Sequence, residues 1–529
     1  MSIIKNHQIE NNTIFNCDIC IIGSGFSSQI LANKLSHKKI IIIESGKINF
    51  DNDAQRLNNL KQDGISFRKD HINRLRQLGG SANLWANQLM TLDEFEVSHR
   101  NWVIDDFAWP IGYEEFKKHY KDVIQNLYLK YLKEINFFTH KDKNLFLENE
   151  FLKNNLFDFN NHFWPGKIDK FNLKTKFTKK LLKKKNIKFI ENFTATKFKI
   201  CNESSYIESL EIKSENKTCK VNSNQFVLAC GAIENARMIL NNEKYNNIFH
   251  NHNTGRYFMD HPRTCLGTIK SNLRLPLGSL FGLKKKNYQF RTSLKLSRKI
   301  QIENKILSSY AFIEPKYSIE DNIFFEKFII EIKKIVRLKG FPRINFSKLN
   351  IKKLLEQMYL KLPPQVSNSK INSILYKLYS FKGHSFLFNE MDVNYQAEQY
   401  PNYQNRIYLN NERDKYYQNY CNINWQLSKM DLKTRDVFSK ILENQLSGNK
   451  YFKFIKNDNS MFSDASHHSG TTRMSKKKSD GVVDTNCKFH DIANLYIVGN
   501  SVFRTSGSAN PGLTNMAISS RLGDYLKTK

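Results

Sequence analysis

Hydrophobic residues near the amino terminus form two short runs that are separated by a glycine turn and a stretch with helical spacing. The first run, 17–22, leads directly into Gly23-Ser24-Gly25, and residues 29–35 have the pattern of a helix. The second run, 40–43, ends in Glu44. Short apolar runs bounded by turn residues are typical of buried strands. The pattern therefore predicts strand, glycine turn, helix and strand, which is the order of a dinucleotide-binding βαβ unit.

Four residues of this unit are candidates for cofactor contacts. Gly23 and Gly25 let the backbone approach a pyrophosphate, which would lie on the amino terminus of the following helix. Ser28 occupies the third position of the glycine pattern, where the residue governs packing between helix and strand. Glu44, at the tip of the second strand, is placed to accept hydrogen bonds from a ribose. NAD and FAD both use such a unit, so this region alone does not distinguish them.

A second group of motifs lies near the carboxyl terminus. It opens with His467-His468-Ser469-Gly470-Thr471, passes through an apolar strand at 494–501, and closes on Asn510-Pro511 before a helical pattern. Pro is preorganised for a helix start, and the residue before it is a natural place for a capping Asn. A helix start offers unpaired N–H groups and partial positive charge to an anion. These motifs predict half of an active site, with a titratable base beside an anion-stabilising helix end.

The order of these carboxyl-terminal motifs resembles the signature of a known enzyme family. The series H-x-x-G-T-x-R-M, G-V-V-D, N-L-Y-I-V-G-x-S and N-P-x-x-T is similar to that of the glucose–methanol–choline (GMC) flavoprotein oxidoreductases. Further segments similar to family landmarks are 74–85 with its G-G-S loop, 102–120, 226–237 and 255–262. The resemblance implies FAD as the cofactor, with contacts from Gly79, Gly80, Ser81, Asn83, Gly231, Asn500 and Pro511. Leu84 precedes Trp85, where relatives with a tethered flavin have a nearby His, so non-covalent FAD is expected.

The resemblance also implies a reaction. His467 would accept the proton of a substrate hydroxyl group, and Asn510 would hydrogen-bond the same oxygen while a hydride passes to N5 of the flavin. His468 is a competing base, but the spacing to Gly470-Thr471 favours His467. His261, in an Asp-His-Pro context, is interpreted as structural, with an orienting hydrogen bond. The expected substrate is an alcohol, sugar or polyol. A dehydrogenase with an unidentified electron acceptor is favoured, and an oxidase that uses oxygen is the alternative.

The implied fold class is α/β, with a Rossmann-like FAD-binding domain and an α+β substrate domain. Residues 1–110, 181–264 and 461–529 are assigned to the FAD-binding domain, and 111–180 to a helical connection. Residues 265–460 are assigned to the substrate domain, where alternating stretches at 406–409 and 421–425 predict strands of an antiparallel sheet that roofs the substrate cavity. A basic insertion at 321–383 is the main departure from the family. Packed helices are expected there, and a lid or a weak peripheral membrane contact is the alternative.

Composition narrows the choice of partners and compartment. The net charge of +32 in 529 residues would suit nucleic acid, but Lys is spread along the whole chain and no nucleic-acid motif is present, so no such partner is expected. The eight cysteines are scattered, as in free thiols. Cys17 and Cys20 would face opposite sides of a strand, so no metal site is assigned. The chain has no run of about 18 apolar residues and no apolar signal core, and a cytoplasmic location is expected.

Two other functions are alternatives to the flavoenzyme. For a NAD-dependent dehydrogenase, the G-G-S loop at 79–81 and the carboxyl-terminal motifs are contrary evidence. For a non-catalytic FAD-binding protein at a membrane, the basic insertion is the only support, and the presence of both His467 and Asn510 argues against it.

Overall fold

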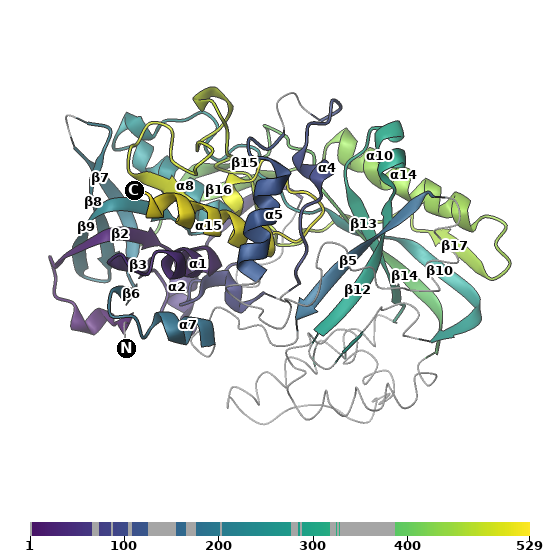
Figure 1. Cartoon of the computed structure of the whole chain (residues 1–529), viewed down its shortest axis with the longest axis horizontal. Helices are drawn as coiled ribbons and strands as arrows, with labels where there is room; N and C mark the ends of the chain where they lie inside the picture. The colour runs from purple at the N-terminus through teal and green to yellow at the C-terminus, as the bar shows by residue number, and fades with distance from the viewer. Residues whose placement is uncertain are drawn as a thin grey trace.

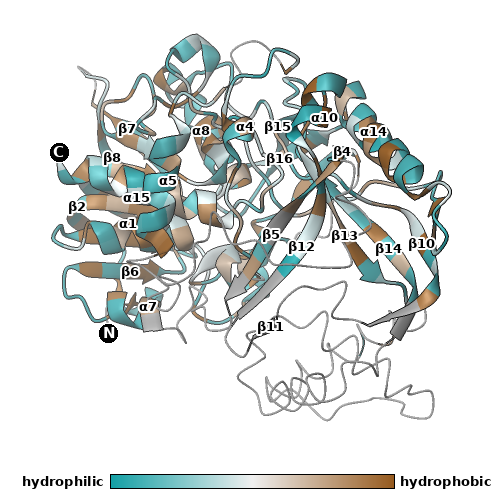
Figure 2. Cartoon of the chain, turned by 45° about the vertical axis from the view of Figure 1, so that its right-hand side comes forward, coloured by the Kyte–Doolittle hydropathy of each residue, from teal (hydrophilic) through white to brown (hydrophobic). Residues whose placement is uncertain are grey.

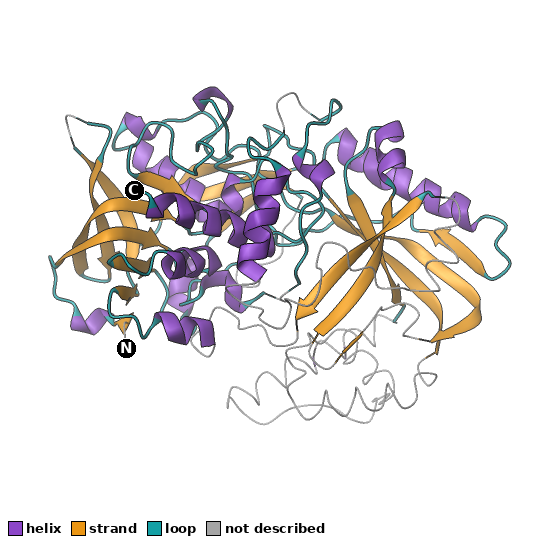
Figure 3. Ribbon diagram, in the orientation of Figure 1, coloured by secondary structure: helices purple, strands orange, loops and turns teal. Residues whose placement is uncertain are grey.

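The computed structural model describes residues 3–65, 73–85, 88–103, 108–124, 155–165, 176–201, 204–276, 284–285, 288–317, 324, 327 and 387–529. Two large sheets lie side by side, and helices pack against each of them (Figure 1, Figure 3). The insertion at 321–383 falls outside the described residues except at 324 and 327, so the expectations for it stay predictions. In the described ranges, no helix combines the length and the apolar character that a bilayer span requires.

The first sheet contains the βαβ unit that the sequence predicts. Strand β2 (Ile14–Ile22) pairs in parallel with β3 (Ile40–Glu44) on one side and with β9 (Lys217–Leu228) on the other. Residues 40–43 are fully buried Ile, as expected for a parallel strand that is covered on both faces. The strand order is β1-β6-β3-β2-β9-β8-β7, and β18 pairs with β9. The remaining strands are β1 (Ile3–Ile4), β6 (Ile187–Glu191), β7 (Thr194–Ile200), β8 (Ile207–Ser214) and β18 (Leu495–Ile497).

Helices from both ends of the chain cover this sheet. Helix α1 (Phe26–Lys34) packs against α15 (Gly512–Lys527), and α15 packs against α5 (Tyr113–Asp122). The contact of α1 with α15 is close, since a Cβ on Gly523 would lie 2.8 Å from Cβ of Lys34. Helix α8 (Ala232–Glu243) follows β9. The other helices are α2 (Asn52–Arg56), α4 (Glu94–Val97), α7 (Lys176–Leu181), α10 (Arg298–Asn304) and α14 (Lys429–Leu446), with 3-10 turns η1 (Asn6–Gln8), η2 (Gly80–Asn83), η5 (Asn247–Phe249), η8 (Lys478–Asp480) and η9 (Asn500–Val502).

The second sheet is antiparallel, with the order β11-β12-β13-β14-β10-β17 and β5 paired with β12. Along β14, Val393 and Tyr395 belong to an apolar cluster with Phe438 of α14, while Asp392 and Asn394 face the other way. Hydrophobic and hydrophilic residues both appear along α14 and these strands (Figure 2). The strands are β5 (Phe157–Pro165), β10 (Arg263–Pro276), β11 (Lys284–Lys285), β12 (Tyr288–Leu296), β13 (Ser309–Pro315), β14 (Leu387–Ala397) and β17 (Phe452–Lys456). The predicted fold class, a Rossmann-like sheet with an antiparallel second sheet, is confirmed.

Two segments of the chain lie elsewhere in the fold than expected. Residues 157–165 were assigned to a helical connection, but they form β5, which pairs with β12 along its whole length. Strands β15 (Arg406–Arg413) and β16 (Asn419–Trp425) were assigned to the roofing sheet, but they join β4 (Leu60–Gly64) in a third sheet. Alternation of polar and apolar residues indicates a strand and its buried face. It does not indicate the partner, which tertiary contacts decide.

Candidate functional site

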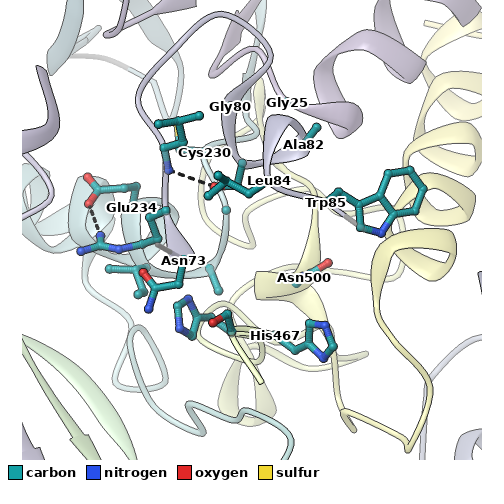
Figure 4. Close-up of a pocket in the computed structure, with 18 of the residues that line it drawn as sticks. Gly25, Asn73, Gly80, Ala82, Leu84, Trp85, Cys230, Glu234, His467 and Asn500 are labelled. Atoms are coloured by element: carbon teal, nitrogen blue, oxygen red, sulfur yellow. Dashed lines mark hydrogen bonds and ion pairs between the residues drawn. The ribbon is translucent and has the colours of Figure 1, made fainter. Parts of the chain in front are cut away.

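One cavity of about 910 Å³ lies between the two sheets and collects most of the predicted site residues. Figure 4 shows Gly25, Gly80, Cys230, Asn500 and His467 around this space. A volume of this size suits a large cofactor together with a small substrate. Ten of the thirteen predicted site residues line it: Gly23, Gly25, Glu44, Gly80, Ser81, Gly231, His467, Asn500, Asn510 and Pro511.

The other three predicted residues, Ser28, Gly79 and Asn83, do not line the cavity but hydrogen-bond residues of the glycine turns that do. Ser28 donates its hydroxyl proton to the carbonyl oxygen of Gly23, at 2.5 Å. Asn83 donates from Nδ2 to the carbonyl oxygens of Leu78 and Gly80, at 3.1 and 3.0 Å. The N–H of Gly79 donates to Oγ of Ser24 at 2.8 Å, which ties the G-G-S loop to the glycine turn. These contacts hold the two turns in place.

The glycine turns form a cradle that a side chain would fill. A Cβ on Gly25 or on Gly231 would meet no atom within 4 Å, so both glycines border open space. Gly231 has φ +84°, a conformation that favours Gly. Gly25 is also the N-cap residue of α1, and no side chain caps that helix start. Its first-turn N–H groups can therefore bind an anion such as a pyrophosphate, so these residues fit a dinucleotide cofactor.

Glu44 orders the same turn. Its Oε2 accepts hydrogen bonds from N and Oγ of Ser24, at 3.2 and 2.5 Å, and its Oε1 accepts from N of Gly46 at 2.8 Å. Burial raises the pKa of the carboxyl group, although the Ser24 and Gly46 hydrogen bonds and Arg76 oppose this. Glu44 lines the cavity at the end of β3, so its oxygens can accept further hydrogen bonds from a ribose.

A cluster of buried charges, formed by Arg74, Arg76, Glu234, Arg237 and Asp414, lines the cavity beside the glycine turns. Glu234 pairs with Arg76 at 2.6 Å, with Arg74 at 3.1 Å and with Arg237 at 3.3 Å. Burial opposes ionisation of Glu234, but the three arginines lower its pKa to about 2. No local sequence pattern marks this cluster, because its members come from separate segments that the fold brings together.

His467 is held through its backbone and through its ring. Its N–H donates to both carboxylate oxygens of Asp260, at 3.1 Å each. Its Nδ1 lies 2.9 Å from Nδ1 of His261, and the two rings are nearly perpendicular at 80°. Ser466, immediately before it, has a left-handed φ of +60°, which marks a sharp turn of the backbone. These contacts fix the direction in which the imidazole enters the cavity.

His468 also lines the cavity, but its surroundings differ. Its Nε2 lies 3.7 Å from Oδ2 of Asp260, and its ring packs against Phe258. Burial and the charge of Arg74 lower the pKa of His468 to about 3. In Asp260, burial and Asp464 raise the pKa to about 7, against the hydrogen bonds from backbone N–H groups. His468 therefore belongs to a buried acidic pocket, and His467 to the contact with His261.

Asn510 does not cap the last helix, contrary to the expectation from the Asn-Pro pair. Pro511 is the N-cap residue of α15, and no side chain caps this start. The carboxamide of Asn510 lies between two glutamines: its Nδ2 donates to Oε1 of Gln88 at 2.6 Å, and its Oδ1 accepts from Nε2 of Gln396 at 3.2 Å. These two contacts hold the amide at the cavity wall.

Several residues that contact the predicted catalytic pair were missed or given another role. Gln396 also lies within 3.2 Å of Nδ1 of His261, so it links His261 with Asn510. Gln88 hydrogen-bonds Nδ1 of His162, a buried residue of β5 whose Nε2 lies 2.8 Å from Oγ of Ser293. Gln88 and His162 carry no local signal in the sequence. The orienting hydrogen bond expected for His261 is present to the carbonyl oxygen of Ser506, at 3.3 Å, and His467 is its second partner.

The second sheet presents polar side chains at the far end of the cavity. Arg291 pairs with Glu314, which also accepts from Nδ2 of Asn394 at 2.5 Å. Arg263 and Asp392 complete this wall. A hydrophilic wall of donors and acceptors suits a polar small molecule better than a hydrocarbon chain.

Known proteins with the same features were identified by sequence and by structure. Residues 401–519 match the carboxyl-terminal model of the family described as GMC oxidoreductase. A stretch of 52 residues is 46% identical to part of pyranose 2-oxidase of Lyophyllum shimeji. This stretch covers 10% of this chain and 8% of that protein. This curated relative is therefore matched over a small part of its length.

Solved structures are similar over nearly the whole chain. Pyridoxine 4-oxidase from Mesorbium loti is 13% identical, covers 97% of this chain and 100% of its own, and superposes with a TM-score of 0.52. A variant of formate oxidase from Aspergillus oryzae RIB40, in which an arginine is replaced by alanine, is 14% identical. The match covers 98% of this chain and 99% of that one, with a TM-score of 0.55. At such identities the likeness shows a common fold.

Proposed function

Because this chain belongs to the GMC oxidoreductase family, we propose that it oxidises a CH–OH group of an alcohol, sugar or polyol. One observation carries this proposal. His467 and Asn510 line the same cavity as the glycine cradle of 23–25, and His261 and Gln396 link the two side chains through hydrogen bonds. FAD, the cofactor of the family, supplies a hydride acceptor when it is bound.

The residues of the cavity wall can be divided between cofactor and substrate. Gly23, Gly25, Gly80 and Gly231, with the uncapped start of α1, would hold a pyrophosphate, and Glu44 would hold a ribose. The uncapped start of α15 at Gly512, also in the wall, would favour negative charge beside it. The polar wall on the second sheet is left for the substrate, and its donors and acceptors support a sugar or polyol.

His467 and Asn510 would act on the substrate hydroxyl group. His467 accepts the proton, because a neutral imidazole is a base near neutral pH. Asn510 donates a hydrogen bond to the same oxygen and so stabilises negative charge on it as the proton leaves. His468 would have a packing role and would not act as the base, since its ring contacts Phe258 and Asp260.

We also propose that the cofactor is held without a covalent bond. Leu84 and Trp85 lie in the cavity wall, at the place where tethered relatives have a His nearby. Cys230 is a nucleophile in the wall, but burial raises its pKa to about 12, so the thiol stays protonated and unreactive. Acid precipitation should therefore release the yellow colour into the supernatant. Flavin that stays in the pellet would contradict this proposal.

The identity of the electron acceptor has two candidates. The sequence favours a dehydrogenase, whereas three proteins that are similar to this chain are oxidases: pyranose 2-oxidase, pyridoxine 4-oxidase and formate oxidase. The test is a panel of primary and secondary alcohols, aldoses and polyols, assayed in parallel with dichlorophenolindophenol under anaerobic conditions and with oxygen alone. Turnover with the dye alone supports a dehydrogenase, and hydrogen peroxide production supports an oxidase. A flavin that no panel member reduces would count against oxidation of CH–OH groups.

A cytoplasmic location is proposed from the composition of the chain. All eight cysteines are free thiols, which supports a reducing compartment. A weak membrane contact through 321–383 stays a prediction that lies outside the described residues. A nucleic-acid partner is not proposed.

A further inference from the structure

The hydrogen bonds behind the catalytic pair begin at a side chain that can only donate. Arg263 donates from Nε to Oε1 of Gln396 at 2.6 Å. A guanidinium group has five N–H donors and no acceptor, so the oxygen of the Gln396 amide must face Arg263. The NH₂ group of Gln396 therefore faces three acceptors, each 3.2 Å away: Nδ1 of His261, Oδ1 of Asn510 and the carbonyl oxygen of Ser508. This one contact fixes which end of Gln396 points into the site.

The orientation of Gln396 determines that of Asn510. Because the Gln396 NH₂ group donates, the atom of Asn510 that faces it must be the oxygen Oδ1. The Asn510 NH₂ group is then turned towards Oε1 of Gln88, 2.6 Å away. An amide nitrogen carries two protons, and one of them is used by Gln88. Asn510 consequently keeps a second N–H donor for a molecule in the cavity, while its oxygen is turned to Gln396.

The tautomer of His261 follows from a second fixed group. Its Nε2 lies 3.3 Å from the carbonyl oxygen of Ser506, which can only accept, so Nε2 carries the proton. Burial lowers the pKa of His261 to about 4, and the ring is neutral near neutral pH. Its Nδ1 is therefore an acceptor, and its one lone pair faces both the NH₂ group of Gln396, at 3.2 Å, and the closer Nδ1 of His467. Across the 2.9 Å contact, His467 must then donate from Nδ1.

We propose that Gln396 and His261 are positioning residues that set opposite hydrogen-bond polarities on the two catalytic side chains. His467 carries its proton on Nδ1, which leaves Nε2 as the proton acceptor, and Asn510 presents an N–H donor. A hydroxyl group needs this combination, because its proton is donated to one group while its oxygen accepts from the other. The roles of His467 and Asn510 rest on the function proposed above. The tautomer itself is a property of the resting protein.

The direct test is nitrogen NMR of the ¹⁵N-histidine-labelled, FAD-loaded protein near neutral pH, without substrate. The resonances of His467 are identified by their loss in His467→Gln. We expect the pattern of a neutral ring that is protonated on Nδ1. A ring protonated on Nε2 would overturn the inference, whatever the outcome of the substrate panel. Conversely, the Nδ1–H tautomer in a protein that oxidises no alcohol would uphold the inference and count against the proposed function.

Variants of His261 test whether this residue acts as a hydrogen-bond acceptor or only fills space beside His467. His261→Asn can place its amide oxygen close to the former Nδ1 atom, so the Nδ1–H tautomer of His467 should persist. His261→Phe keeps a planar ring but has no acceptor, so His467 should shift to the Nε2–H tautomer. With the best alcohol of the panel, the rate of flavin reduction should fall at least about tenfold in His261→Phe, and by no more than the ~10²–10⁴ attributed to a general base. It should be largely restored in His261→Asn. Equal tautomer patterns in the two variants would contradict the inference.

Gln396→Glu tests the polarity at almost constant shape. One carboxylate oxygen can still accept from Arg263, but the other replaces the NH₂ group with an acceptor. His261 should then take up a second proton, because its Nε2 still faces the carbonyl oxygen of Ser506 and its Nδ1 now faces a carboxylate. With a donor at Nδ1 of His261, His467 should lose its Nδ1 proton, and the Asn510 amide should turn over. Gln404→Glu, on an exposed loop, is the matched control for the added charge and should leave the His467 signals unchanged. If Gln396→Glu kept both the wild-type tautomer and the rate of flavin reduction, Gln396 would have no role in setting polarity.

Discussion

The Nδ1 atoms of His261 and His467 lie 2.9 Å apart, although 206 positions separate the two residues in the sequence. The neighbour of His261, Asp260, accepts the backbone N–H of His467 with both carboxylate oxygens. One dipeptide therefore holds both the backbone and the ring of the candidate base. This double contact explains why an Asp-His pair that looks structural in the sequence belongs to the active-site region.

The roles of the two adjacent histidines can be separated by substitution. A general base typically contributes about 10²–10⁴ in rate, so His467→Ala should slow flavin reduction by that order while FAD still binds. His468→Ala should slow it much less, because its ring contacts Phe258 and Asp260. Anaerobic stopped-flow bleaching of the flavin measures both. If His468→Ala were slow and His467→Ala nearly normal, the base would be His468 and not His467.

Gly25→Ala should weaken FAD retention without unfolding the protein. Gly25 has φ −67°, which any residue adopts, and its added methyl group would enter the open cradle. Filling space that a ligand needs costs about 1–3 kcal/mol, measured as the change in FAD dissociation constant. Gly112→Ala is the control: it is also a helix N-cap residue with φ −74° and open surroundings, but it lies outside the cavity. Equal FAD affinity in the two variants would exclude a cofactor at the glycine turn.

Glu44→Ala should also weaken FAD retention. The loss of a hydrogen bond to a charged group costs about 1–3 kcal/mol, and Ser24 and Gly46 would lose their acceptor as well. Glu191 is the matched control, since it occupies the same register on the neighbouring strand β6 but does not line the cavity. Glu191→Ala should lower the melting temperature and leave the FAD affinity unchanged. An unaltered affinity in Glu44→Ala would show that the ribose is held elsewhere.

The buried carboxyl group of Asp260 should make stability depend on pH. Burial and Asp464 raise its pKa to about 7 in the folded protein, from an ordinary value near 4 in the unfolded chain. The folded state then binds more protons than the unfolded state between about pH 4 and 7. The contribution of Asp260 to the free energy of unfolding is therefore complete below about pH 4 and is lost as the pH rises through about 7. The loss is on the order of a few kcal/mol.

Asp260→Asn removes this titration and can keep an oxygen for the N–H groups of His261, Ala465 and His467. Between about pH 4 and 7, the free energy of unfolding should therefore rise in the variant relative to the wild type as the pH increases. Urea denaturation across this range measures the difference. Parallel curves for the two proteins would show that Asp260 titrates normally.

The sequence by itself predicted the fold class, which the structure confirms, and the glycine turns and Glu44 that are proposed to hold the cofactor. The reason is that these features are local. The turn at Gly23–Gly25, Glu44 at the end of its strand and Gly231 before a helix act through backbone shape and position, which a short stretch of sequence fixes. Family motifs added His467 and Asn510, and both lie in the cavity wall together with these glycines.

Only the tertiary structure decided how the two candidate catalytic side chains, His467 and Asn510, are oriented. Gln88, His261 and Gln396 come from three segments, and each makes its hydrogen bond to the pair across more than a hundred positions of the chain. Packing decided that β5 belongs to the antiparallel sheet and that the Asn510 amide bonds Gln88 and Gln396 instead of capping the helix that follows it. Hydrogen-bond polarity depends on which donors and acceptors are brought within about 3 Å. That distance is set by the folded chain and not by the spacing of residues in the sequence.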